Sequence, residues 1–228
     1  MSQNNKIELE QLELLVSEIF YSIQGEGTNA GKPCVFIRLK GCNLRCCWCD
    51  TVYAQDAEEN EEFTNAKIIY DQIRQYKCQF IEFTGGEPLL QRDVIAFMEF
   101  LCDEGYQVAI ETNGTISISP IDKRVIKIVD IKCPSSGMSQ FINFDCLLEL
   151  GKNDDIKFVI SNKEDFLWAK SIVKLYNLEN VCNSILFSPV YNFLEPKILA
   201  KWILEEHLKV RLQLQLHKYI WGADIRGV

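Results

Sequence analysis

The stretch GCNLRCCWCDT, residues 41–51, places four of the chain's ten cysteines within eleven residues. Cys42, Cys46 and Cys49 are separated by gaps of three and two residues. A tight loop with this spacing can bring three thiolates to one face of a cubane iron–sulfur cluster, whose fourth iron then stays open to another ligand. Cys47 lies next to Cys46, and we interpret it as a small buried residue.

Two other interpretations of this loop stay open on the residues alone. A structural zinc site takes four ligands, usually in two short pairs, and the sequence holds no second pair of this kind. A redox pair formed by Cys46 and Cys49 is typical of a helix start in a thioredoxin-type fold, and the residues after Cys49 lack a helical pattern. Ligand preference favours the iron–sulfur site over both alternatives.

The composition of the chain limits its class. Its 228 residues, 47% apolar and 25% charged, suit one large globular domain. A net charge of −8 without a basic tract disfavours binding to nucleic acid, so we expect a small-molecule or protein partner. No apolar run reaches the roughly 18 residues of a membrane span, and the N-terminal residues do not resemble a secretory signal. These features predict a cytoplasmic protein without stable disulfides.

Apolar and β-branched runs alternate along the chain with segments of helical spacing. This alternation predicts a parallel sheet with right-handed crossovers, preceded by two extended segments over residues 17–27 and 33–42. Helices are predicted over residues 66–76, 92–105, 163–176 and about 196–206. Strands are predicted over residues 35–40, 80–84, 106–112, 125–132, 155–161, 184–190 and 209–220.

Four unusual segments directly follow predicted strands: the cysteine loop, TGGEP (84–88), ETNG (111–114) and KCPSSG (132–137). The carboxyl ends of parallel strands meet at one edge of a sheet, and the chemistry of α/β proteins takes place at that edge. The sequence therefore predicts that these four segments form a single site.

The cysteine spacing resembles that of the radical S-adenosylmethionine superfamily. GGEP begins thirty-six residues after Cys49 and is similar to the second motif of that superfamily. A larger set of motifs resembles the 7-carboxy-7-deazaguanine synthase family. These motifs are IQGEG (23–27), GCNLRCCWCDT (41–51), TGGEPLLQ (84–91), ETNGT (111–115), DIKCPSSGM (130–138) and QLHKYIWG (215–222).

The resemblance has implications for fold and reaction. It runs from about Glu18 to the C-terminus, with an N-terminal extension over residues 1–17 and one domain over residues 18–228. It implies an α/β fold, an abridged, partial (β/α) barrel with a mostly parallel six-stranded sheet. The implied reaction converts 6-carboxy-5,6,7,8-tetrahydropterin to 7-carboxy-7-deazaguanine with loss of ammonia, on the route to queuosine and other deazapurines. A reduced cluster would cleave S-adenosylmethionine, and the 5′-deoxyadenosyl radical would take hydrogen from the pterin and later return it.

The resemblance also implies a set of site residues. It assigns none of them a catalytic role, because the radical comes from the cofactor. Cys42, Cys46 and Cys49 would ligate a 4Fe–4S cluster, and Thr51 would bind Mg²⁺, which keeps few protein ligands. S-adenosylmethionine is expected to contact Trp48, Cys49, Asp50, Gly86, Glu87, Glu111, Asn113, Ser135, Ser136, Gly137, Ser188 and Val190. The pterin is expected to contact Ile23, Gln24, Gly25, Glu26, Arg38, Thr84, His217 and Val228.

Simpler roles compete for several of these residues on local sequence alone. An ordinary surface salt bridge would also explain Arg38. Thr51 has the character of a turn or cap residue, and Asn113 with Gly114 is typical of a hairpin turn. The resemblance favours the binding roles for Arg38, Thr51 and Asn113.

Partners and alternative functions follow from the same motifs. The resemblance implies an electron donor of flavodoxin or ferredoxin type and a homodimer. An activase that makes a glycyl radical on a partner protein would share the cysteine loop, but it would need neither QGEG nor QLHK. A zinc-stabilised interaction domain would contain zinc without iron or sulfide.

Substitution of adjacent cysteines tests the ligand assignment. If only the set with gaps of three and two residues binds iron, Cys46→Ala loses the cluster and Cys47→Ala keeps it. The measurement is the visible absorbance of the cluster after anaerobic reconstitution. Equal loss of absorbance in both variants would overturn the assignment.

Overall fold

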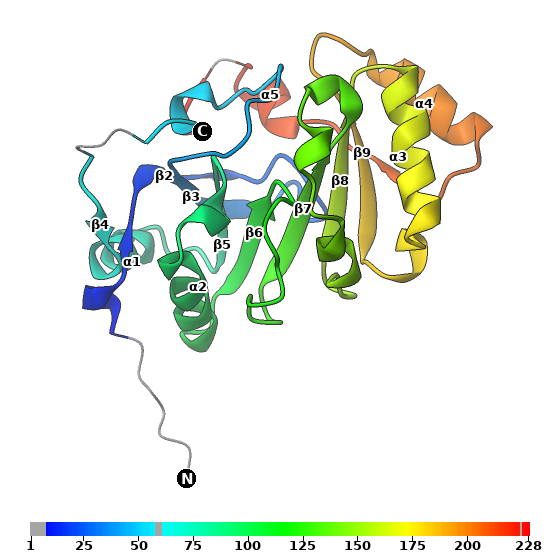
Figure 1. The fold of residues 1–228 in the computed structure, drawn as a ribbon. Coiled ribbons are helices and arrows are strands. Elements are labelled where there is room, and N and C mark those ends of the chain that lie inside the picture. Colours follow the sequence, from blue (N-terminus) through cyan, green and yellow to red (C-terminus); the bar gives the residue numbers. More distant parts are fainter. Residues whose placement is uncertain (1–7, 58–60, 224) are drawn as a thin grey trace.

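The computed structural model describes residues 8–57, 61–223 and 225–228. Its centre is a sheet with strand order β10-β9-β8-β7-β6-β5-β3-β2, beside a separate pair formed by β1 and β4 (Figure 1). The strands are β1 (Glu13–Leu14), β2 (Val16–Ile23), β3 (Pro33–Leu39), β4 (Thr64–Asn65), β5 (Phe80–Gly85), β6 (Gln107–Thr112), β7 (Ile126–Lys132), β8 (Asp155–Ile160), β9 (Ser184–Pro189) and β10 (Arg211–Leu212). The α-helices are α1 (Ala66–Gln75), α2 (Asp93–Asp103), α3 (Lys163–Leu175), α4 (Pro196–Glu205) and α5 (Leu216–Ile220).

The expected α/β fold with a mostly parallel sheet is confirmed, but the expected number of strands is wrong. The sheet has eight strands within the described residues rather than six. The six strands from β3 to β9 in this sheet are parallel, and each of them coincides with a predicted strand. The two further strands lie at its edges: β2 is antiparallel to β3, and β10 is a short strand parallel to β9.

Two of the α-helices, α1 and α3, begin at a side-chain cap and bury an apolar face. The Asn65 side chain accepts a hydrogen bond from the amide of Lys67 at the start of α1, and Asn162 caps α3 in the same way. Figure 1 shows α3 and α4 side by side next to β8 and β9. Residues buried on these helices include Ile69, Ile73, Val94, Phe97, Met98, Leu101, Phe166, Ala169, Leu199 and Ile203. No helix within the described part of the chain is long and apolar enough to cross a membrane.

Residues 8–17 pack as part of the domain rather than as a separate extension. The expected boundary between residues 17 and 18 falls inside β2, which begins at Val16. Leu9 and Leu14 are buried in the same hydrophobic core as the central strands. Glu13 pairs with Asn65 at the start of α1.

The C-terminal segment differs from the predicted strand over residues 209–220. Only Arg211–Leu212 pairs with β9, and the helix α5 begins at Leu216. The alternating pattern RLQLQL is broken by tertiary contacts, because Gln213 and Gln215 donate side-chain hydrogen bonds to Glu26. The Gln213 amide still donates to the Phe187 carbonyl of β9 at 2.9 Å, and three residues later the Leu216 amide donates to Gly25 in the QGEG loop. In Figure 1 the cysteine loop and α5 lie together along the upper edge of the sheet.

Candidate active site

A cleft of about 960 Å³ opens at the carboxyl edge of the parallel strands. It brings together most of the residues predicted from the sequence, although they come from segments as distant as residues 23 and 228. The predicted residues that line it are Ile23, Gln24, Gly25, Glu26, Arg38, Cys42, Cys46, Trp48, Cys49, Asp50, Thr51, Thr84, Gly86, Glu111, Asn113, Val190, His217 and Val228. Glu87, Ser135, Ser136, Gly137 and Ser188 lie outside the lining.

The cysteine loop is held against the sheet by its own backbone. The Gly41 amide donates to the Ala54 carbonyl at 2.9 Å, and the Cys42 amide donates to the Gln55 carbonyl at 2.8 Å. Cys42, Cys46 and Cys49 are unbridged by disulfides and line the cleft. Burial raises the pKa of the Cys46 thiol to about 11, so binding of a metal centre has to displace its proton.

The three cysteines fit a cluster better than a single ion. Within the described residues, no group of three or more His, Cys, Asp or Glu side chains is arranged around one metal ion. A cubane cluster places each thiolate on a separate iron, so its ligands need to share a wall rather than a point. Cys42, Cys46 and Cys49 meet that requirement, because all three line the same cleft.

Cys47 departs from the sequence-based interpretation. It is exposed rather than buried, and it does not line the cleft. Its amide donates to the Ser136 carbonyl at 3.2 Å, and its sulfur lies beside Gly137. The backbone bond to Ser136 thus ties Cys47 to the loop after β7, on the outside of the cysteine loop.

The two glycines of GGEP allow β5 to end directly against the cysteine loop. A Cβ atom on Gly85 would collide with the Leu39 backbone, and one on Gly86 would collide with the Gly41 carbonyl. The amides of Gly86 and Glu87 donate to the carbonyls of Leu39 and Gly41 at 3.0 and 2.8 Å. The first role of these glycines is therefore close contact between two loops of the protein.

Glu87 is fully buried and acts behind the cleft rather than in its wall. Its carboxylate accepts hydrogen bonds from the Asn113 amide at 2.7 Å and the Thr112 hydroxyl at 2.8 Å. These bonds fix the ETNG segment against GGEP. Asn113 itself lines the cleft while its Oδ1 accepts from the Thr115 amide, so the turn role and a ligand-facing position coexist.

The serine-rich loop after β7 likewise serves the protein's own packing. The Ser136 hydroxyl donates to the Cys133 carbonyl at 2.6 Å, and the Ser135 hydroxyl accepts from the Asn162 side chain at 2.8 Å. Ser188 is buried at the end of β9. Ser135, Ser136, Gly137 and Ser188 therefore lie outside the lining of the cleft, and their predicted cofactor contacts stay predictions.

The QGEG loop and the C-terminal QLHK segment form the opposite end of the cleft. The Leu216 amide donates to the Gly25 carbonyl at 2.9 Å. A Cβ atom on Gly25 would collide with the His217 ring, so glycine is required for this close approach. Gln24 uses its side chain internally, because Nε2 donates to Glu82 and Oε1 accepts from the Glu26 amide. Gln24 therefore orients the loop.

Glu26 is surrounded by hydrogen-bond donors. Its carboxylate accepts from Lys157 at 3.0 Å, from Gln213 at 2.8 Å and from Gln215 at 3.0 Å. Burial acts to raise the pKa of Glu26, but Lys157 and His217 oppose it and the net pKa is lowered. Sequence reasoning missed Lys157 and Gln213, which belong to no motif, and it assigned no role to Gln215, the first residue of the QLHKYIWG motif. All three are recognised by their contacts with Glu26.

Arg38 and Thr51 lie in the wall between these two ends. The Arg38 guanidinium donates to Glu18 at 2.7 Å, and both side chains line the cleft, so the pair is not an ordinary surface salt bridge. Thr51 precedes a short 3₁₀ helix but its side chain makes no capping hydrogen bond. Its hydroxyl is therefore not used by the turn, and it faces Cys49 at 3.7 Å.

The C-terminal tail covers part of the cleft. Lys218 pairs with Asp50 at 2.9 Å, which joins α5 to the cysteine loop. The Arg226 guanidinium lies over the Tyr53 ring at 3.6 Å from its centroid. Val228, the last residue, lines the cleft as expected from the sequence.

A parallel partial barrel with a three-cysteine loop beside GGEP defines an enzyme of the radical S-adenosylmethionine class. The model of the Radical SAM superfamily matches residues 36–135. The crystal structure of QueE from Escherichia coli superposes with a TM-score of 0.76 at 21% identity, covering 95% of this chain and all of that one, which supports the fold.

Curated relatives identify the family within this class. The 7-carboxy-7-deazaguanine synthase of Chlorobaculum tepidum is 44% identical, covering 94% of this chain and 97% of that protein. Those of Koribacter versatilis and Clostridium acetobutylicum are 39% and 36% identical and cover 93% of this chain. The chain belongs to the 7-carboxy-7-deazaguanine synthase family, and the family and enzyme class expected from the motifs are confirmed.

A buried carboxyl under the QGEG loop generates a prediction about pH. Burial raises the pKa of Glu82 to about 8, so the folded protein keeps a proton there that the unfolded chain loses near its ordinary value of 4.5. Between these two pKa values the folded state thus binds more protons than the unfolded state. The contribution of Glu82 to the free energy of unfolding therefore falls as pH rises toward 8. Because Glu82→Gln cannot ionise, the variant should gain stability relative to the parent between pH 5 and 8.

Denaturant unfolding at several pH values measures this difference. Glu62→Gln, which removes an exposed carboxylate, is the matched control and should follow the parent. A constant difference between Glu82→Gln and the parent across this range would show that Glu82 is ionised in the folded protein.

Proposed function

We propose that the cleft binds 6-carboxy-5,6,7,8-tetrahydropterin beside S-adenosylmethionine and converts the pterin to 7-carboxy-7-deazaguanine with loss of ammonia, for queuosine and related deazapurines. One observation carries this proposal. The QGEG and QLHK segments, from opposite ends of the chain, pack together in the same cleft that Cys42, Cys46 and Cys49 line. A glycyl-radical activase would have no use for that second, acceptor-rich end.

The cysteine wall suits a 4Fe–4S cluster held by Cys42, Cys46 and Cys49. When bound, the cluster supplies the electron that starts radical chemistry on S-adenosylmethionine. The protein's own residues position the reactants. GGEP and ETNG, fixed to each other through Glu87, form the wall next to the cysteine loop. Lys218 and Arg226 hold α5 and the tail against the cysteine loop and Tyr53, a position that would limit the access of water to the cleft.

The opposite end of the cleft suits the ring of a pterin. An aminopyrimidinone edge carries N–H donors, and the ionised carboxylate of Glu26 is a matching acceptor. Arg38 lies in the wall and offers N–H groups beyond the one that Glu18 accepts, which suits the pterin carboxylate. His217, packed on Gly25, completes this end.

Magnesium binding by Thr51 is the finer part of the proposal. Its support is the hydroxyl that the adjacent turn leaves without a capping bond. Thr51→Ala removes this ligand with little change of volume, so fold and cluster absorbance should survive. Binding of the tetrahydropterin, titrated anaerobically with and without Mg²⁺, should lose its magnesium enhancement in the variant.

Thr64→Ala serves as the control, because Thr64 lies outside the cleft. An unchanged magnesium enhancement in Thr51→Ala would return Thr51 to a turn residue. The electron donor of flavodoxin or ferredoxin type and the homodimer stay predictions from the family resemblance.

The assignment of Glu26 as a substrate reader is the central test of the proposed function. Glu26→Gln keeps the size of the side chain but replaces an acceptor oxygen with a donor amide. An unmatched buried polar group costs about 1–3 kcal/mol, so tetrahydropterin binding should weaken on the order of 10–100-fold. Cluster absorbance and S-adenosylmethionine binding should stay at parent levels.

Anaerobic titration with the tetrahydropterin provides the measurement. Glu149→Gln is a matched control, because Glu149 accepts hydrogen bonds from Ser117 and Ile118 outside the cleft. If Glu26→Gln binds the pterin as tightly as the parent, Glu26 only shapes the turn and the pterin lies elsewhere.

A further inference from the structure

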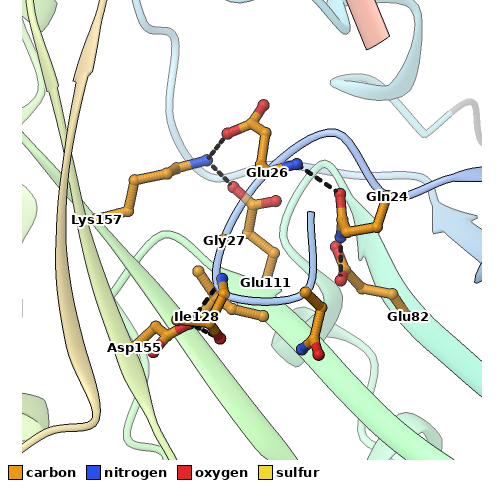
Figure 2. Close-up of a pocket in the computed structure, with 10 residues that line it drawn as sticks. Gln24, Glu26, Gly27, Glu82, Glu111, Ile128, Asp155 and Lys157 are labelled. Carbon is orange, nitrogen blue, oxygen red and sulfur yellow. Dashed lines mark hydrogen bonds and ion pairs between the residues drawn. The ribbon is translucent and has the colours of Figure 1, made fainter. Parts of the chain in front are cut away.

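Lys157 is a buried lysine at the centre of the pterin end of the cleft. It lies on β8 with only 4% of its surface exposed, and its strand register places it opposite Asp130 on β7. Its ammonium group is 3.0 Å from Glu26, 3.2 Å from Asp130 and in contact with Glu111. Figure 2 shows Glu26 and Glu111 converging on this nitrogen from the loop after β2 and from β6.

A buried ammonium is costly unless it is paired, and here one cation meets three carboxylates. Burial alone lowers the pKa of Lys157, but Asp130, Glu111 and Glu26 raise it well above its ordinary value. Lys157 therefore stays charged. Its three partners come from three different elements, so the ammonium ties β6, β7 and the QGEG loop together at the cleft.

The carboxylates do not share this cation equally. The pKa of Glu26 is lowered despite its burial, whereas burial raises the pKa of Glu111. Asp130 has a second cation, because Lys132 lies 2.9 Å from it. Glu26 has no other lysine or arginine partner within the described residues, so Lys157 is its main source of positive charge, with His217 as the weaker one.

The group formed by Lys157 and its three carboxylates also leaves one hydrogen-bond acceptor free for a ligand. Asp130 lines the cleft, and only 5% of its surface is exposed. Its Oδ2 faces Lys132 and Lys157, while its Oδ1 has no hydrogen-bond partner among the described residues. This end of the cleft is therefore built to receive N–H or O–H donors.

We propose that Lys157 is a positioning residue of the substrate site, whose single ammonium group fixes Glu26, Glu111 and Asp130 against one another and keeps Glu26 available as an ionised acceptor for the pterin. The inference rests on the proposed function for the identity of the ligand. It assigns to Lys157 no contact with the substrate. Its effect on binding passes through the charge and orientation of Glu26.

The test compares Lys157→Met, which removes the charge, with Lys157→Arg, which keeps it. Other charged or titratable groups facing these carboxylates and Lys157 are Glu82 on β5, Lys132 on β7 and His217 on α5, and neither variant substitutes any of them. Lys127→Met is the matched control, because Lys127 is also buried and paired, with Asp154 at 3.1 Å, but lies outside the cleft.

The affinity of each variant for the tetrahydropterin is measured by anaerobic titration between pH 6 and 8. Its ratio to the affinity of the parent at the same pH is the relative affinity. Without the ammonium, the pKa of Glu26 rises, because burial is then opposed only by the weaker contributions of His217 and Gln215. Lys157→Met should bind about tenfold or more weakly, and its relative affinity should fall further toward pH 6. In Lys157→Arg the relative affinity should not vary with pH, and Lys127→Met should bind as tightly as the parent. A flat ratio in Lys157→Met, at any affinity, overturns the proposal.

Stability gives a second readout that does not depend on the substrate. In Lys157→Met the folded pKa of Glu26 lies above its unfolded value, so its contribution to stability is retained at low pH and lost as pH rises. The variant should therefore be most stable, relative to the parent, near pH 6, where it is best purified. Equal pH dependence of unfolding in variant and parent would also contradict the proposal.

A measurement on the parent protein covers the case in which Lys157→Met does not fold. With ¹³C-labelled glutamate side chains, the Glu26 carboxyl signal is identified by its absence in Glu26→Gln. It should stay ionised from pH 8 down to pH 5, and titration between pH 6 and 8 would overturn the inference. If the parent does not bind the tetrahydropterin, the proposed function fails, while this signal still tests whether Glu26 is held ionised beside Lys157.

Discussion

The backbone of Gly85 and Gly86 lies directly against that of Leu39 and Gly41, with no space for a Cβ atom between them. This contact follows from the parallel register of β3 and β5, which ends with Leu39 opposite Gly85. It places the start of the cysteine loop on the end of the neighbouring strand. Any side chain at Gly85 or Gly86 would separate the two loops, and the cysteine wall and the ETNG segment behind it depend on their contact.

The cleft built on this contact has two ends of different character. One end carries thiols whose pKa is raised by burial, as at Cys46, and these suit a metal centre that displaces their protons. The other end carries Glu26, Glu111 and Asp130 around one buried ammonium, and it suits a ligand rich in hydrogen-bond donors. This separation lets a single cleft accept a cofactor and a heterocycle side by side.

Residues far apart in the sequence complete the cleft. Lys218 joins α5 to Asp50 in the cysteine loop, and Gln213 and Gln215 join the C-terminal segment to Glu26. The same contacts explain why an alternating RLQLQL pattern ends as a helix and tail. Here the hydrogen bonds to Glu26 outweigh a local preference for an extended edge strand.

Strand periodicity and motif spacing are local properties of the chain, so the six parallel strands, the class of the enzyme and the segments that line its cleft could be predicted from the sequence. The sequence also predicted extended chain at β2 and β10, but not the antiparallel pairing of β2, the shortness of β10 or the exposure of Cys47. Nor did it reveal Glu87 as a support behind the cleft or Lys157 as its buried cation. Only strand register and packing decide these roles, because the partners of a buried charge come from elements distant in sequence.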